Sequence, residues 1–99
     1  MVIIGMNSFP TESSKEMGQR FVKIPPLPTY ITKKGPYFSS ELGVGTKALS
    51  VFEVEPSKMA EANQYIANYY ATYIGVPGYT YTIGTWLEAM EALKVIGMA

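Results

Sequence analysis

Two short stretches of the chain are apolar in both alternating registers, which is unusual for strands of so small a protein. Residues 2–6 read Val-Ile-Ile-Gly-Met, and residues 48–54 read Ala-Leu-Ser-Val-Phe-Glu-Val. Successive side chains of a strand point to opposite faces, so a strand of this kind needs cover on both faces. The pattern predicts strands over 2–9 and 47–55. The chain holds enough helix to cover one face, so we expect a second copy to cover the other.

The segment after the first strand has the apolar spacing of a helix. Apolar residues recur at i, i+4 and i+7 from Met17 to Ile24. Ser13 and Glu16 have the spacing of a capping box at its start. We expect this helix to end before the prolines of 25–28, because each proline lacks an N–H group and restricts the residue before it.

Two further helices are expected in the second half of the chain. One opens at 56–57, where Pro and Ser suit a first turn, and stops near Gly75. A short C-terminal helix is expected to open at a second capping-box spacing, Thr85 and Glu88, and to end at Gly97. At helical spacing, the second helix places its apolar residues on one face: Met59, Ala62, Ile66, Tyr70 and Tyr73.

Glycine and proline divide the rest of the chain into strands and turns. The run Lys-Lys-Gly-Pro at 33–36 predicts a turn, and 37–41 then has the character of a strand. Gly-Val-Gly at 43–45 predicts a hairpin connection to the strand at 47–55. Residues 79–83 alternate between Tyr or Ile and Thr, as a half-exposed strand does.

The order of these elements predicts an α+β fold in a single domain over residues 1–99. Strand, helix, two strands, helix and strand is the ferredoxin-like βαββαβ sandwich, here with an extra C-terminal helix. Its four-stranded antiparallel sheet has the first and third strands at the centre. The two doubly apolar stretches fall on those two strands, while the second and fourth carry Ser and Thr.

On this element order and face polarity the whole chain resembles the dimeric α+β barrels. The resemblance implies that the bare faces of two sheets pack together, and that a ligand cleft lies between sheet and helices. Such barrels include cofactor-independent monooxygenases, muconolactone isomerase-like enzymes and stress-response proteins. The stretches Lys-Gly-Pro-Tyr at 34–37 and Gly-Val-Pro-Gly-Tyr at 75–79 also resemble parts of an uncharacterised branch of small proteins.

Composition narrows the chemistry that the chain can support. Eight basic and eight acidic residues give a formal net charge of zero, so we expect no nucleic-acid partner. The absence of Cys and His excludes disulfides, thiolate chemistry, catalytic triads and zinc sites of the usual ligands. We expect no metal and no cofactor. The apolar N-terminal run is too short for a signal peptide or a membrane span, which favours a cytoplasmic protein.

Eight tyrosines are the strongest candidates for a binding site, because Tyr combines an apolar ring with a hydroxyl that can orient a ligand. Tyr65, Tyr69 and Tyr73 form a ridge on the second helix. If this ridge meets the tyrosines of the strands, they line a cleft suited to a planar or aromatic molecule. Alternatively, they are core and dimer-interface aromatics. The strand tyrosines considered for this cleft are Tyr37, Tyr79 and Tyr81.

Three charged residues are further candidates. Glu53 interrupts an apolar strand, and a carboxylate in an apolar cavity has a raised pKa that suits a base. The alternative is a Glu at the sheet margin paired with a Lys across the strands. Lys33 and Lys34 beside a glycine could receive an anion, although such a short charge run is usually solvated.

The sequence leaves three hypotheses of function. The first is a small homo-oligomer, a dimer in the simplest case, that is structural or binds a small apolar or aromatic ligand. The second is a cofactor-independent monooxygenase-like or isomerase-like enzyme acting on such a molecule. The third, an ACT-like regulatory module or an RNA-recognition domain, shares the element order but lacks the charge and strand aromatics of RNA binding.

Overall fold

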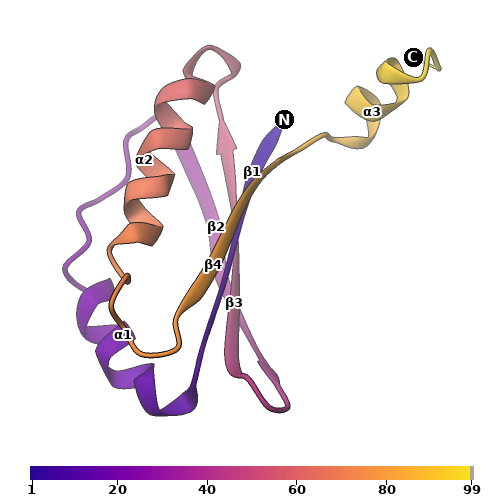
Figure 1. The fold of residues 1–99 in the computed structure, drawn as a ribbon. Coiled ribbons are helices and arrows are strands. Elements are labelled where there is room, and N and C mark those ends of the chain that lie inside the picture. The colour runs from indigo at the N-terminus through magenta and orange to yellow at the C-terminus, as the bar shows by residue number, and fades with distance from the viewer. Residues whose placement is uncertain (99) are drawn as a thin grey trace.

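The computed structural model describes residues 1–98, which form a four-stranded antiparallel sheet with two helices packed on one face (Figure 1). The elements follow in the expected order: β1 (Val2–Phe9), α1 (Ser14–Phe21), β2 (Ile31–Glu41), β3 (Gly45–Val54), α2 (Met59–Ala71), β4 (Thr80–Trp86) and α3 (Ala89–Val95). Single 3-10 turns, Thr11–Ser13 and Pro56–Lys58, precede α1 and α2.

The two doubly apolar strands occupy the centre of the sheet, as the sequence pattern predicts. The strand order is β2-β3-β1-β4, so β1 and β3 each have a strand on both sides. Ile3 lies opposite Phe52 across the central pair, and both side chains are fully buried. The apolar face that contains these two residues is the one that the helices cover.

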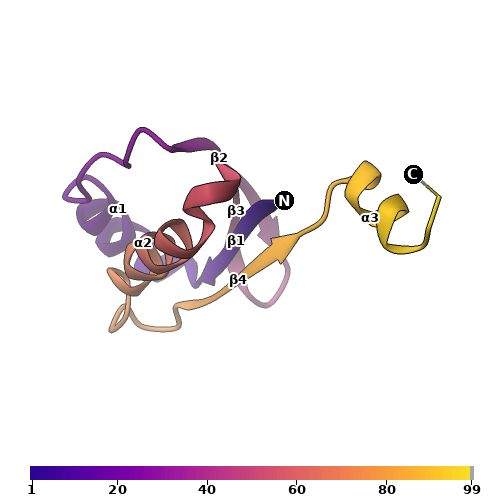
Figure 2. The same ribbon diagram turned by 90° about the horizontal axis from the view of Figure 1, so that it is seen from above.

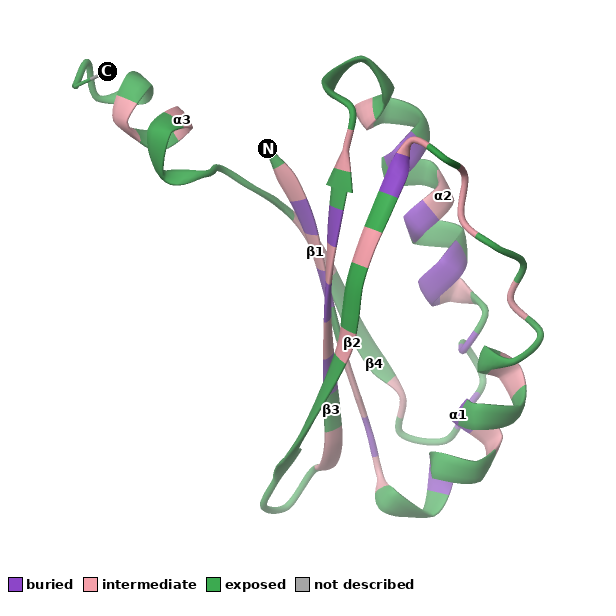
Figure 3. Ribbon diagram, turned by 180° about the vertical axis from the view of Figure 1, so that it is seen from behind, coloured by how far each residue is buried: buried purple, intermediate pink, exposed green. Residues whose placement is uncertain are grey.

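The core lies between this face and α2, whose apolar face matches the expectation from helical spacing. Ala62, Ile66, Tyr70 and Tyr73 are buried there and Met59 is half-buried. Buried segments run along the facing sides of α2 and the sheet (Figure 3). Burial of this kind contributes about 1.5–3 kcal/mol for each large apolar side chain. The other core residues are Ile3, Phe9, Met17, Ile31, Phe52, Tyr69 and Val76.

The second face of the sheet is open. Side chains of β1 and β3 meet there in register, Ile4 opposite Val51 and Met6 opposite Leu49, and form one contiguous apolar strip. Figure 2 shows α1 and α2 together on one side of the sheet, whereas α3 lies on the other side beyond the end of β4. Within residues 1–98, no helix packs on this strip, and Met6 remains 38% exposed.

The prediction of a turn at 33–36 is wrong, because β2 begins at Ile31 and runs through these residues. The strand absorbs the glycine and proline as a bulge between Lys34 and Tyr37, with Gly35 at φ +98°. Lys34 still pairs with Val51 and Tyr37 with Leu49. A bulge with a left-handed glycine and a proline is tolerated here because β2 is an edge strand.

The expected helix starts also need correction. The Ser13 hydroxyl gives no cap, because it donates to the Pro77 carbonyl at 2.7 Å instead. The second helix begins at Met59, and Ser57 lies in the preceding 3-10 turn. Pairing of β4 with β1 continues to Trp86, so the C-terminal capping box is Glu88 with Glu91, one turn later than expected.

The C-terminal helix α3 stands away from the body of the molecule (Figure 1). It contributes no buried residue to the described structure, although Met90, Val95 and Ile96 are large apolar side chains. An ion pair joins the Glu91 carboxylate to the N-terminal ammonium of Met1. No helix in the described part of the chain is long and apolar enough to cross a membrane.

Candidate functional site

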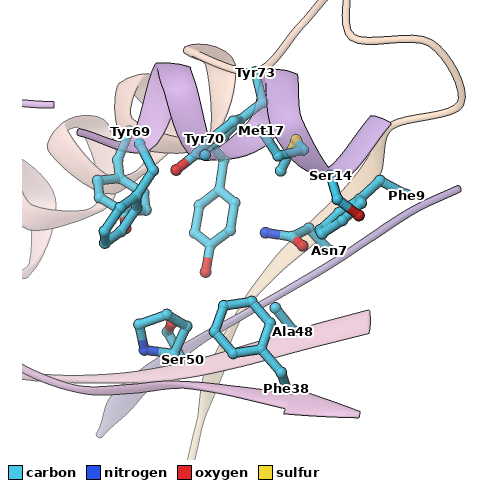
Figure 4. Close-up of a pocket in the computed structure, with 13 residues that line it drawn as sticks. Asn7, Phe9, Ser14, Met17, Phe38, Ala48, Ser50, Tyr69, Tyr70 and Tyr73 are labelled. Carbon is cyan, nitrogen blue, oxygen red and sulfur yellow. The ribbon is translucent and has the colours of Figure 1, made fainter. Parts of the chain in front are cut away.

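A cavity of about 330 Å³ lies between the helices and the covered face of the sheet (Figure 4). Its walls come from α1, the last part of β1, the second half of β2, the middle of β3, and the end of α2 with the turn that follows it. The lining residues are Asn7, Phe9, Ser14, Met17, Gly18, Phe21, Pro36, Phe38, Ala48, Ser50, Tyr69, Tyr70 and Tyr73.

The cavity exists because the sheet carries small side chains beneath the helices. Asn7, Ala48 and Ser50 face the helices at the middle of β1 and β3, where large residues would fill the space. The end of the sandwich beyond Ser50 is filled by Phe52, which is fully buried. Along this face of β3, Phe52 fills the space under the helices, whereas the smaller Ser50 and Ala48 leave the cavity open.

The walls are apolar with a few polar groups, as small-molecule sites commonly are. No charged side chain is among the lining residues of the described structure. Asn7 lies in the middle of a central strand, and its Oδ1 is buried without a hydrogen-bond partner among residues 1–98. An unpaired buried acceptor costs about 1–3 kcal/mol. Asn is also depleted in strands. Asn7 is therefore unusual both for its residue type in a strand and for its unpaired buried oxygen.

Three tyrosines, two at the end of α2 and one in the turn after it, form the roof of the cavity and belong to a larger aromatic cluster. Tyr69 packs edge to face on Tyr70 and on Tyr73, with ring centroids 5.3 and 6.4 Å apart. Tyr70 also stacks on Tyr81 of β4 at 5.8 Å. Tyr79 lies against Tyr73 at 5.4 Å, and its hydroxyl donates to the Tyr70 carbonyl.

Burial keeps the hydroxyls of this cluster protonated at neutral pH. Desolvation raises the pKa of Tyr70 to about 12, against a lowering effect of the Ser50 hydroxyl beside it. Desolvation also raises the pKa of Tyr73 to about 12, against a hydrogen bond with Tyr69. The pKa values of Tyr69 and Tyr79 are raised for the same reason. These groups are therefore neutral donors and acceptors toward anything in the cavity.

Lys33 lies on the covered face of β2, beside two residues that line the cavity. Its Nζ donates to the Tyr69 hydroxyl and lies 4.7 Å from the Tyr69 ring centroid and 5.3 Å from that of Phe21. Desolvation lowers its pKa. The ammonium is held by a hydroxyl and two ring faces rather than by a carboxylate. Lys34, the other expected anion receptor, points to the open face.

The structure brings together only half of the predicted site. Tyr69 lines the cavity, and Tyr79 and Tyr81 are stacked behind its roof. Tyr65 is half-buried at the outer side of α2, where its hydroxyl donates to the Pro26 carbonyl at 3.1 Å. The convergence expected of the helix ridge and the strand tyrosines therefore occurs for β4 and not for β2.

The other two candidates lie on the open face of the sheet. Tyr37 is 61% exposed and borders a shallow hollow there with Met6 and Leu49. The Glu53 carboxylate pairs with Lys34 at 2.6 Å across β2 and β3. The interpretation of Glu53 as a marginal residue in a cross-strand pair fits this geometry. The interpretation as a base in an apolar cavity does not.

Sequence reasoning missed the polar residues beneath the helices, Asn7 and Ser50. A signal was present, because Asn7 shares a strand face with Ile3, Gly5 and Phe9 and is the one amide in that row. Face alternation alone identifies it as a polar residue in a core position.

The residues that the structure describes hold no cluster of three acidic side chains that would bind a metal ion. Comparison of the chain with protein-family models, with curated proteins and with solved structures gives no match.

Proposed function

We propose that this chain is a small homodimeric protein that binds an apolar or aromatic small molecule between its helices and its sheet. The observation that carries the proposal is the cavity beneath α1 and α2. A void of about 330 Å³ is within the range of ligand sites and large for an unused gap in a 99-residue domain.

We further infer that the domain is a ferredoxin-like sandwich of the kind that pairs into a dimeric α+β barrel. The element order and the strand order β2-β3-β1-β4 support this assignment. The strip of Ile4, Met6, Leu49 and Val51 supports pairing through the open face, because two sheets packed face to face bury such strips against each other.

The C-terminal segment gives separate support for a dimer. Trp86 and Leu87 are about half exposed, and Met90, Val95 and Ile96 of α3 are more exposed still. The segment that carries them continues from the end of β4, and α3 lies on the side of the sheet away from α1 and α2 (Figure 2). A second copy packed on that face would cover these residues, which find no cover within residues 1–98 of their own chain.

The enzyme hypothesis has less support. A tyrosine serves as a base only when its pKa is lowered toward the working pH, and burial instead raises the pKa of Tyr70 and Tyr73 to about 12. Glu53 lies on the opposite face from the cavity, in an ion pair. No base of ordinary strength therefore lines this cavity within the described structure, and binding is the function that the geometry favours.

Native mass spectrometry of the protein purified from its own host tests both parts of the proposal. We expect the mass of two chains together with a retained small molecule. The Ala48→Met variant, which adds bulk beneath the helices, should keep the dimer and lose the molecule. Ala67→Met makes the same change on the exposed side of α2 and should keep both. A single chain without added mass would contradict the proposal.

A further inference from the structure

We propose that the cavity selects an uncharged ring molecule that carries one hydroxyl or similar polar group, and that Asn7 recognises this group. The inference rests on the proposed binding function and specifies the class of its ligand. It is carried by three observations on the cavity: its neutral lining, the amide of Asn7 and the protonated roof.

The lining excludes an ionic ligand on grounds of desolvation. A charged group moved from water into an apolar site without a partner of opposite charge pays a large penalty. Among the described residues, none of the cavity walls carries a charge. The tyrosine roof stays neutral because burial holds Tyr70 and Tyr73 protonated. The nearest cation, Lys33, lies outside the lining and already donates to Tyr69.

The amide of Asn7 provides the polar anchor. In Figure 4 its side chain points from β1 toward Tyr70, in the middle of the cavity. Its Oδ1 has no donor within residues 1–98. The torsion that turns an amide end for end is soft, so either Oδ1 or Nδ2 can face a ligand. A hydroxyl both donates and accepts, and it therefore suits the amide in either orientation.

The rest of the lining selects the body of the ligand. Three phenylalanines and a methionine add apolar lining around the cavity: Phe9 and Phe38 from the sheet, and Met17 and Phe21 from α1. Aromatic walls of this kind pack on a flat ring by stacking and edge contacts. A ring with a single hydroxyl places its polar end at Asn7 and its apolar body against these side chains.

Three bicyclic probes of similar size separate the possibilities: naphthalene, 2-naphthol and 2-naphthoate. Binding is measured by titration calorimetry or by the probes' own fluorescence. For the natural sequence we expect 2-naphthol to bind about tenfold more tightly than naphthalene, the value of one buried hydrogen bond. We expect 2-naphthoate to bind more weakly than either.

The Asn7→Leu variant tests the role of the amide, because Leu has a similar shape and no polar atom. We expect the preference for 2-naphthol over naphthalene to disappear. Removal of a buried acceptor without a partner should also raise the midpoint of thermal unfolding, by roughly 5 °C. A purely structural Asn would give the opposite shift. Asn63→Leu, the same change on the exposed side of α2, should leave the preference intact.

Each contrary result has a definite meaning. Equal affinity for naphthalene and 2-naphthol in the natural sequence would overturn the role of Asn7. Tighter binding of 2-naphthoate, lost in Lys33→Met, would overturn the neutral class and leave the proposed binding function in place. Failure of all three probes would overturn the inferred class, whereas the binding function itself is judged by the molecule retained from the host.

Discussion

The helix layer and the sheet approach each other closely at a glycine. A Cβ on Gly5 would lie 2.1 Å from the Tyr70 hydroxyl oxygen and 2.4 Å from the ring carbon that bears it. The backbone at Gly5 is ordinary strand, so the requirement for glycine is one of space alone. The Tyr70 ring can extend from α2 down to the sheet only because β1 has no side chain there (Figure 4).

Substitution of Gly5 by Ala should therefore destabilise the protein by overpacking. We expect a loss of about 2 kcal/mol or more in the free energy of unfolding, measured by urea denaturation. Gly18→Ala is the matched control, because a Cβ there meets nothing within 4 Å. That change in α1 should stabilise by about 0.5–1 kcal/mol. Equal effects of the two substitutions would refute the steric argument.

The buried tyrosines predict a loss of stability at alkaline pH. Their pKa values are raised in the folded protein, to about 12 for Tyr70 and Tyr73, above the ordinary value of about 10. Their protonated forms are favoured by folding, so this contribution is complete below pH ~10 and falls as the pH rises from there to 12.

Urea denaturation at a series of pH values, followed by circular dichroism, measures this fall. The part of the tyrosinate absorbance that comes from the buried tyrosines should rise together with the unfolding transition rather than before it. Tyr70→Phe removes one of the groups and should flatten the pH dependence. A midpoint that stays constant between pH 9 and 12 would contradict the assigned shifts.

At the scale of elements, the periodic patterns of apolar residues predicted the strands and helices better than the short turn and cap motifs did. The strands β1 and β3 and the face of α2 were predictable, because burial imposes a period on many residues at once. The continuous strand through 33–36 was not predictable, because Gly35 and Pro36 suit a turn and a β-bulge equally well. Whether a strand resumes after them depends on pairing with β3, a contact distant in the sequence.

The predicted cap of the first helix was wrong for a similar reason. Ser13 and Glu16 have the spacing of a capping box, but each finds a better partner outside it. The Ser13 hydroxyl bonds to Pro77, 64 residues away, and Glu16 pairs with Arg20 at 2.9 Å. A local motif states what a side chain can do, and the tertiary neighbours decide which option is taken.

The candidate site was predictable only in part, because it depends on small residues rather than conspicuous ones. The sequence indicates that tyrosines of α2 and β4 share the covered side, as Tyr69, Tyr79 and Tyr81 do. It does not reveal that Ala48 and Ser50 leave space beneath them. A cavity is a missing volume, and it emerges only when the distance between helix and sheet is known.

At the scale of the whole molecule, the sheet separates two surfaces with different expected roles. The covered face holds the core and the cavity, and the open face holds the apolar strip. Residues that alternate along β3 therefore report on different properties. Phe52 is fully buried beneath the helices, and Leu49 belongs to the strip on the open face.

Asp substitutions at these two positions should separate folding from dimer formation. Phe52→Asp places a carboxylate in the core and should abolish cooperative unfolding, since the loss of about 3–5 kcal/mol for a truncated Phe is compounded by a buried charge. Leu49→Asp should leave circular dichroism nearly unchanged and shift the mass found by light scattering from two chains to one. Two like charges at a self-matching interface repel each other.

Ala67→Asp, on the exposed side of α2, is the control for added charge and should remain a dimer. The emission of Trp86, the single tryptophan, gives a second measurement. Its side chain is 51% exposed in one chain, and a partner that covers the open face should shift its emission to the blue. Leu49→Asp should reverse that shift. A Leu49→Asp protein that is still dimeric would show that the two copies meet elsewhere, and that the strip on β1 and β3 serves another purpose.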